Sequence, residues 1–359
     1  MRRFALLVLA LAAWTSAHAA SFDCKLAKSP REKAICADPR LSDLDTKIAV
    51  GYKTLLQQLS PRAAGEVRDD QRAWLRWLDQ SCPLPASPED FKIETCLSNA
   101  YQSRLENLAP VRAGDGSSVF YPRAAFGYKK ESGETLAPND PGFGTCEFSW
   151  PQMDASTPNA AAWNAAAYKA ALNLAQDDDK KPPVDFASYD CGGGTIDIDY
   201  DLLAANQHMI DVSFSVATYG YGAAHPQESR VSLLWWLEQR RLVQVQDVLS
   251  NDNAARAKVV TLLVSRLKAR IQDSGADDKS LNGSTTDELA STSEWTLSNS
   301  GLMITFNPYE VGPWALGAPT VCASWADLKP AMNPALRTQD LPALLPPRND
   351  FAPSCKDRN

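Results

Sequence analysis

The chain has 359 residues, eight cysteines, and 36 Lys and Arg against 43 Asp and Glu, which gives a formal net charge of −7. This acidic balance argues against a nucleic-acid partner, because the phosphate backbone is bound mainly by clustered Lys and Arg. A chain of this length is also expected to form more than one domain.

The first twenty residues have the pattern of a secretory signal peptide. Arg2 and Arg3 precede an apolar run over residues 4–14, and Ala17 and Ala19 supply the small residues that a signal peptidase requires. The apolar run is too short to span a bilayer as a helix. We therefore expect a signal peptide over residues 1–20, no transmembrane segment after its cleavage, and a periplasmic or secreted protein.

The number and spacing of the cysteines predict disulfides. An even count behind a signal peptide favours disulfide bonds over metal or thiol chemistry. No two cysteines have C-x-x-C spacing, which disfavours a zinc ribbon or a thioredoxin-like pair. The cysteines expected to form bonds are Cys24, Cys36, Cys82, Cys96, Cys146, Cys191, Cys322 and Cys355.

Residues 21–110 are predicted to be helical. Apolar residues recur at spacings of three, four or seven over residues 41–59, 67–78 and 96–108. This spacing places them on one face of each of three amphipathic helices. The three helices would form one small domain with a shared apolar core.

The helix order indicates one pairing of the first four cysteines. The first predicted helix leads away from Cys36, and the second returns to Cys82. The two cysteines would then lie at the same end of a helical hairpin. We expect a Cys36–Cys82 bond enclosed by a Cys24–Cys96 bond, although four cysteines allow three pairings.

The composition changes at residue 110. Residues 111–119 are rich in Gly, Asp and Ser and are predicted to be a linker. Residues 21–110 hold 13 basic and 13 acidic residues, whereas residues 111–359 hold 21 basic and 30 acidic residues, a net charge of −9. A cationic partner would be attracted to the second region.

Residues 111–359 are predicted to form a sheet with packed helices. Polar and apolar residues alternate over 195–200 and 209–216, which indicates strands, while two other segments have helical spacing. The further strands are predicted at 231–237, 242–245 and 303–306, and the helices at about 160–175 and 253–272. The simplest remaining disulfides are Cys146–Cys191 and Cys322–Cys355. The fold class is therefore α+β, with a disulfide-stapled N-terminal three-helix domain and a C-terminal antiparallel-sheet domain with packed helices.

The N-terminal region carries a recognisable set of motifs. They are F-D-C at 22–24, P-R-E-K-A-I-C at 30–36 and Q-R-A-W-L at 71–75, followed by Cys82 and Cys96. This pattern resembles the N-terminal domain of the LprI family, which is named for a lysozyme inhibitor. The resemblance implies a small exported helical domain.

Two motifs in the second region carry a different resemblance. They are Y-G-Y-G-A-A-H-P at 219–226 and G-L-M-I-T-F-N-P-Y-E-V-G-P-W at 301–314. Over residues 190–330 the chain resembles the extracellular module of the RsiV anti-sigma factor and of some peptidoglycan deacetylases. RsiV receives lysozyme through this module, so the resemblance implies a lysozyme-type partner, whose basic surface would complement the acidic second region. The chain differs from RsiV because it has no transmembrane helix or cytoplasmic segment.

The aromatic and ionisable residues of these motifs are the candidate partner-binding residues. They are Tyr219, Tyr221, His225, Tyr309, Glu310 and Trp314. Exposed aromatic residues commonly dominate the affinity of protein interfaces. The alternative is a structural role, in which His225 bonds a backbone carbonyl, Tyr309 covers the core and Glu310 pairs locally. Residues 83–94 form a candidate loop that would enter an enzyme cleft.

No familiar catalytic motif is present. After the predicted cleavage only His208 and His225 remain, so an H-E-x-x-H zinc site cannot form, and there is no G-x-S-x-G elbow or P-loop. We expect no catalytic residue, no metal and no cofactor. The predicted function is an exported envelope protein that binds a lysozyme-type muramidase, by occluding its cleft or by sequestering it. The alternatives are a peptidoglycan-acting enzyme or accessory module, and a structural envelope protein.

Overall fold

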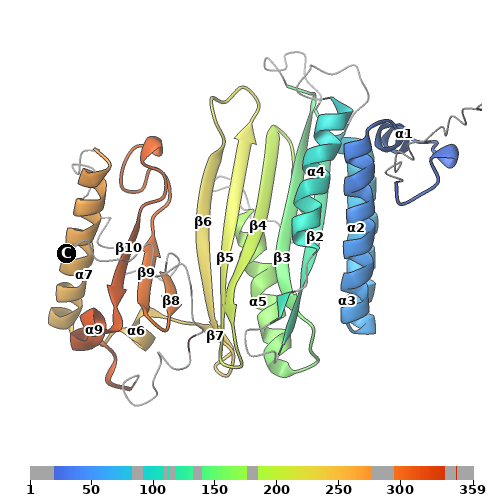
Figure 1. The fold of residues 1–359 in the computed structure, drawn as a ribbon. Coiled ribbons are helices and arrows are strands. Elements are labelled where there is room, and N and C mark those ends of the chain that lie inside the picture. Colours follow the sequence, from blue (N-terminus) through green and yellow to red (C-terminus); the bar gives the residue numbers. More distant parts are fainter. Residues whose placement is uncertain are drawn as a thin grey trace, which may run out of the picture.

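The computed structural model describes residues 20–82, 92–108, 111–112, 118–131, 140–175, 185–275, 295–335 and 345 (Figure 1). The predicted signal peptide up to residue 19, most of the candidate loop at 83–94, and Cys355 lie outside these ranges. Within the described ranges, no helix combines the length and the apolar character needed to cross a bilayer.

Helices make up the described N-terminal part, and three of them begin at a Ser-Pro or Asp-Pro pair. The side chains of Ser29, Asp38 and Ser60 accept hydrogen bonds from backbone N–H groups of the first helical turns. Proline suits the next position because a backbone N–H there would have no partner within the helix. The elements are η1 (Cys24–Leu26), α1 (Pro30–Ala37), α2 (Pro39–Gln58), α3 (Pro61–Ser81) and α4 (Ile93–Asn107).

The three predicted apolar stripes form the core of this part. Leu55, Trp74 and Leu97, one from each stripe, have at most 1% of their surface exposed. The short helix α1 was not predicted, because its eight residues carry almost no apolar periodicity. The presence of α1 determines how the first four cysteines pair.

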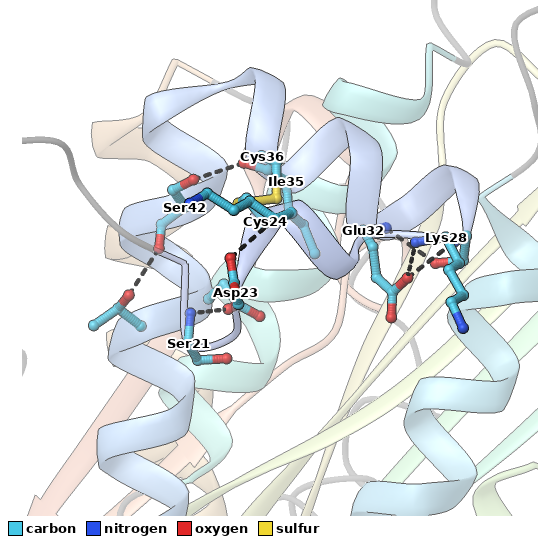
Figure 2. Close-up of a disulfide and its surroundings, with 12 residues drawn as sticks. Ser21, Asp23, Cys24, Lys28, Glu32, Ile35, Cys36 and Ser42 are labelled. Carbon is cyan, nitrogen blue, oxygen red and sulfur yellow. Dashed lines mark hydrogen bonds between the residues drawn. A yellow bond between two sulfur atoms is a disulfide. The ribbon is translucent and has the colours of Figure 1, made fainter.

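The predicted pairing of the first four cysteines is wrong. Cys24 bonds to Cys36 and Cys82 bonds to Cys96, with Cα atoms 5.7 and 5.5 Å apart. Figure 2 shows the first bond, which links the turn before α1 to the end of α1. Cys36 therefore ends a helix of its own instead of opening the α2–α3 hairpin. Cys82 ends α3 and Cys96 lies in the first turn of α4, so the second bond is also local.

A seven-stranded sheet follows, and its strands lie side by side in the order in which they occur in the chain. Its strands are β1 (Val111–Arg112), β2 (Val119–Lys130), β3 (Phe143–Met153), β4 (Gly194–Ala205), β5 (Met209–Gly220), β6 (Gln227–Trp236) and β7 (Arg241–Leu242). All neighbours are antiparallel except β3 and β4, which the crossover helix α5 (Pro158–Leu174) connects in parallel. The ends of the predicted linker belong to this sheet, because β1 pairs with the start of β2.

Helix α5 covers one face of this sheet. Ala160, Trp163, Ala167 and Ala171 are fully buried against it. The small alanine side chains allow the helix to approach the strands closely, and Trp163 fills the remaining space against Phe120. This helix agrees with the prediction, whereas β2 and β3 were not predicted.

A three-stranded sheet forms the rest of the described chain. Its strands are β8 (Trp295–Ser298), β9 (Gly301–Thr305) and β10 (Thr320–Ser324), in the order β10-β9-β8. The predicted helix α7 (Asn253–Asp273) packs on β10, with its four-residue apolar repeat fully buried. Shorter elements complete this part: α6 (Val245–Val248), η6 (Trp314–Leu316), α9 (Trp325–Leu328) and η7 (Lys329–Ala331). The short helix η3 (Phe186–Ser188) packs with the seven-stranded sheet instead.

The helical part packs directly on the seven-stranded sheet (Figure 1). The indole Nε1 of Trp77 in α3 donates to the carbonyl of Gly127 in β2 at 3.0 Å. Ser60 donates from its backbone and its hydroxyl group to the carboxylate of Asp154, at 2.7 and 2.6 Å. Helix α4 lies across the face of the sheet opposite α5, where its residues line a cavity with Glu147 of β3 and Asp197 of β4 (Figure 1).

The predicted Cys146–Cys191 bond is confirmed. It joins β3 to the segment before β4 and requires a glycine on the neighbouring strand, because a Cβ atom at Gly127 would lie 2.2 Å from the sulfur of Cys191. Cys322 on β10 is also disulfide-bonded. Its predicted partner, Cys355, lies outside the described residues.

Candidate functional site

Two motifs that lie about eighty residues apart in the sequence meet at one surface. His225 lies in the turn between β5 and β6, and Tyr309 and Trp314 lie in the loop after β9. The His225 ring stacks on Trp314 with centroids 4.7 Å apart, and its Nε2 lies 3.3 Å from the hydroxyl of Tyr309. We name these three residues the aromatic patch.

An asparagine side chain docks the second motif on the sheet. The Asn307 amide oxygen accepts from the backbone N–H of Arg230 at 2.5 Å, and the amide nitrogen donates to the carbonyl of the same residue at 3.1 Å. The amide thus pairs with the edge of β6 as a neighbouring strand would. It does so at Arg230, a position that the two-residue strand β7 does not cover. Glu310 accepts from the backbone N–H and the side chain of Asn307, so its carboxylate is used locally.

The aromatic patch is exposed. Tyr309 and Trp314 expose 55% and 41% of their surface. Tyr309 does not cover the core, and its backbone has φ of +74°, a left-handed conformation that costs a non-glycine residue on the order of 1–3 kcal/mol. His225 also contacts its own turn, because Nδ1 lies 2.8 Å from the carbonyl oxygen of Pro226. Strained backbone and exposed aromatic rings occur together here.

A cavity of about 610 Å³ adjoins the aromatic patch. Trp314 and Asn307 form one wall, and Glu228 and Arg230 of β6 form the other. Both charge signs are therefore present beside the exposed rings. A cavity with charged side chains in its lining, next to an aromatic surface, suits contact with the polar side chains of a protein partner.

The remaining two candidates lie elsewhere. Tyr219 and Tyr221 form an edge-to-face pair with centroids 6.2 Å apart. Tyr221 lines a second cavity, between α4 and the seven-stranded sheet, with a volume of about 400 Å³. The structure thus brings together His225, Tyr309, Glu310 and Trp314, and places Tyr221 at a different cavity with Tyr219 packed against it.

The second cavity contains carboxylates that the sequence analysis did not single out. The pKa of Glu147 is raised to about 8 and that of Asp197 to about 6, in each case by desolvation within the surrounding protein and by a neighbouring carboxylate. The alternating Ile-Asp-Ile-Asp run at 196–199 was the available signal, but alternation alone does not show what covers the polar face. Within the described residues, no three His, Cys, Asp or Glu side chains are placed to hold a metal ion.

Comparison with family models assigns two regions of the chain. Residues 24–112 match the family described as lysozyme inhibitor LprI. Residues 246–325 match a family described as a protein of unknown function, DUF3298. No curated protein matches the chain significantly.

Solved structures of the second family show weak similarity. A DUF3298 family member from Bacteroides fragilis is 15% identical, with a TM-score of 0.43, and the match covers 62% of this chain and 96% of that one. A DUF3298 family protein from Pseudomonas aeruginosa is 13% identical, with a TM-score of 0.42, and the match covers 60% and 95%. The chain joins an LprI lysozyme-inhibitor domain at residues 24–112 to a DUF3298 domain at residues 246–325.

Proposed function

We propose that this protein is exported and binds a lysozyme-type muramidase, with the aromatic patch as a principal contact. The match of residues 24–112 to the lysozyme inhibitor family supports the class of partner. The stacking of His225 on the exposed rings of Tyr309 and Trp314 supports the location of the contact. Disulfides in both parts of the chain suit a location outside the cytoplasm.

The chemistry of the patch suits a basic protein. Lysine and arginine side chains bind the faces of Trp and Tyr rings, and such contacts gain strength when the partner excludes water. Residues 111–359 carry a net charge of −9, which would speed the approach of a cationic partner. Binding would sequester the enzyme or occlude its substrate cleft.

We also propose boundaries for the signal peptide and the two domains. Residues 1–20 would be removed on export, residues 21–110 would form the helical domain and residues 111–359 the sheet domain. The mass of the protein recovered from the periplasm or the medium tests the first assignment. A mass corresponding to a chain that starts at residue 20 or 21 is expected, and a full-length mass in the cytoplasm would contradict export.

Titration of the mature protein into hen-type lysozyme tests the binding. Binding and muramidase activity are followed at low and high salt, with Trp314→Ala as the test variant. Loss of a central aromatic contact should weaken binding by at least about 2 kcal/mol. Leu242→Ala is the matched control, because Leu242 on β7 is 42% exposed and lies outside the patch.

The outcomes separate the parts of the proposal. Weaker binding of Trp314→Ala with unchanged binding of Leu242→Ala supports the patch as the contact surface. Binding without loss of muramidase activity supports sequestration of the enzyme over occlusion of its cleft. Absence of binding by the unsubstituted protein at both salt concentrations would overturn the proposed function.

A further inference from the structure

The cavity between α4 and the seven-stranded sheet is built from polar faces of both. Strand alternation sends Cys146 and Phe148 of β3 toward α5, and Glu147 between them toward the cavity. The parallel register of β3 and β4 places Glu147 directly beside Asp197. Two carboxylates therefore share one wall of a cavity of about 400 Å³.

Helix α4 supplies the opposite wall. Asn99, Ser103 and Asn107 follow one another at four-residue spacing, so they lie on one face of the helix and line the cavity. Asn107 bonds to Asp199, which neighbours Asp197 on the same face of β4. The cavity is thus rich in hydrogen-bond acceptors on the sheet side and has amide and hydroxyl groups on the helix side.

The carboxyl groups of this cavity have no cationic side chain beside them in the described lining. None of the described lining residues is Lys, Arg or His. Arg104 of α4 attracts Glu147 electrostatically, but it is almost fully buried, donates to Gln71 at 3.1 Å and lies against the ring of Trp74. Arg104 is therefore engaged in the helical core and is not among the lining residues.

Two polar atoms in the lining are buried without a hydrogen-bond partner among the described residues. They are Oε1 of Glu147 and Oγ of Ser81, and Ser81 is only 6% exposed. Unsatisfied buried polar atoms are costly, and a ligand that donates hydrogen bonds would remove the cost. The two atoms belong to β3 and α3, so the ligand would lie between the sheet and the helical part.

We propose that this cavity binds an organic cation, a primary ammonium or guanidinium group carried on a flexible chain. Such groups have donors and no acceptors, and they match the acceptors of Glu147, Asp197 and Ser81. The rings of Trp77 and Tyr221 in the lining add faces that attract cations. A free anion would be repelled, and a neutral sugar would bring no positive charge to the carboxyl groups of the lining.

Calorimetric titration of the mature protein with agmatine tests the inference. Agmatine carries one ammonium and one guanidinium group on a four-carbon chain. The titration is run at about pH 8.5, above the pKa of about 8 of Glu147, so that both carboxyl groups are ionised. Asp197→Asn and Glu147→Gln should then each weaken binding by at least about tenfold, the effect of losing a charge-assisted bond. Ser103→Leu, which fills the cavity from α4, should abolish binding and provides a test that leaves both carboxylates in place.

The matched control lies on the same strand. Asp201→Asn removes a carboxylate of β4 whose side chain is 69% exposed and lies outside the cavity lining, and agmatine binding should be unchanged. The neutral trisaccharide chitotriose should not bind. Any one of three results would overturn the inference: no saturable binding of millimolar agmatine, equal binding by the Asp197→Asn, Glu147→Gln and Asp201→Asn variants, or preferential binding of chitotriose.

The inference is independent of the proposed partner, because agmatine binding is measured without lysozyme. A further arm identifies the source of the cation. Competition between agmatine and lysozyme would assign the cavity to a lysine or arginine side chain of the protein partner. Agmatine binding with no such competition would assign the cavity to a free small cation.

Discussion

Arg123 of β2 holds Asp70 of α3 through two parallel hydrogen bonds, Nε to Oδ2 at 2.7 Å and Nη2 to Oδ1 at 3.2 Å. Asp70 is 7% exposed and also accepts from the backbone N–H of Ala124. This pair lies between the helical part and the sheet. It therefore ties the two parts together through a charge that is removed from water.

Removal of one partner of this pair should be costly. Arg123→Ala leaves the buried Asp70 carboxylate without its counter-charge, and a loss of about 3–5 kcal/mol in the free energy of unfolding is expected. Urea unfolding measures it. Arg72→Ala is the control, because Arg72 pairs with Asp69 on the solvent side of the same helix and should contribute no more than about 1 kcal/mol. Equal effects of the two changes would show that the buried pair is not a strong link.

A methyl group at position 127 should destabilise the protein. Gly127→Ala places a Cβ atom 2.2 Å from the sulfur of Cys191, so the disulfide or β2 must shift, at a cost of about 1–3 kcal/mol. Thermal unfolding under oxidising conditions measures the effect. Gly65→Ala is the control, because no atom lies within 4 Å of the added methyl group on α3, and gains of up to about 1 kcal/mol are expected there. An unchanged thermal stability of the Gly127→Ala variant would mean that β2 can shift without an energetic cost.

Stability should fall as the pH rises from about 4.5 to about 8. Burial raises the pKa of Glu147 from its ordinary value of 4.5 to about 8, so in this interval the folded protein keeps a proton that the unfolded chain has released. Asp197, whose pKa burial raises to about 6, acts in the same direction over the lower part of the interval. Arg104 opposes the shift of Glu147, and Asp199 adds to it.

Glu147→Gln isolates this contribution. The amide does not ionise, so the loss of unfolding free energy between pH 5 and pH 8 should shrink by more than about 1 kcal/mol. Denaturant unfolding at several pH values measures the slope, and the exposed Glu228→Gln on β6 is the control. An unchanged slope in Glu147→Gln would show that Glu147 is ionised in the folded protein at neutral pH.

Much of the secondary structure could be predicted from short stretches of sequence. The three helical stripes, the alternating strands β4 and β5, and the helices α5 and α7 all lie where periodicity placed them. The strands β2 and β3 escaped prediction, because both of their faces are largely covered and their residues do not alternate clearly. Helix α1 was missed because its apolar pattern is weak, although both hydrogen bonds of a capping box mark its start.

The candidate site was predictable only in part. Its aromatic residues could be named from their motifs, but the stacking of His225 on Trp314 depends on Asn307 docking a distant loop on β6. Glu147 was not singled out, because nothing local distinguishes it from an exposed strand residue. Its environment is made by α4 and by the register of β4.

The sequence by itself determined the apolar stripes of the long helices, the strand periodicity and the presence of disulfides, because apolar spacing, alternation and cysteine content act within a few residues or through composition. Only the tertiary structure decided which cysteines bond, which rings stack and which carboxylates become neighbours. Those outcomes depend on how elements that lie tens of residues apart are packed and registered. A one-residue change of register between β3 and β4 would separate Glu147 from Asp197 without altering either strand.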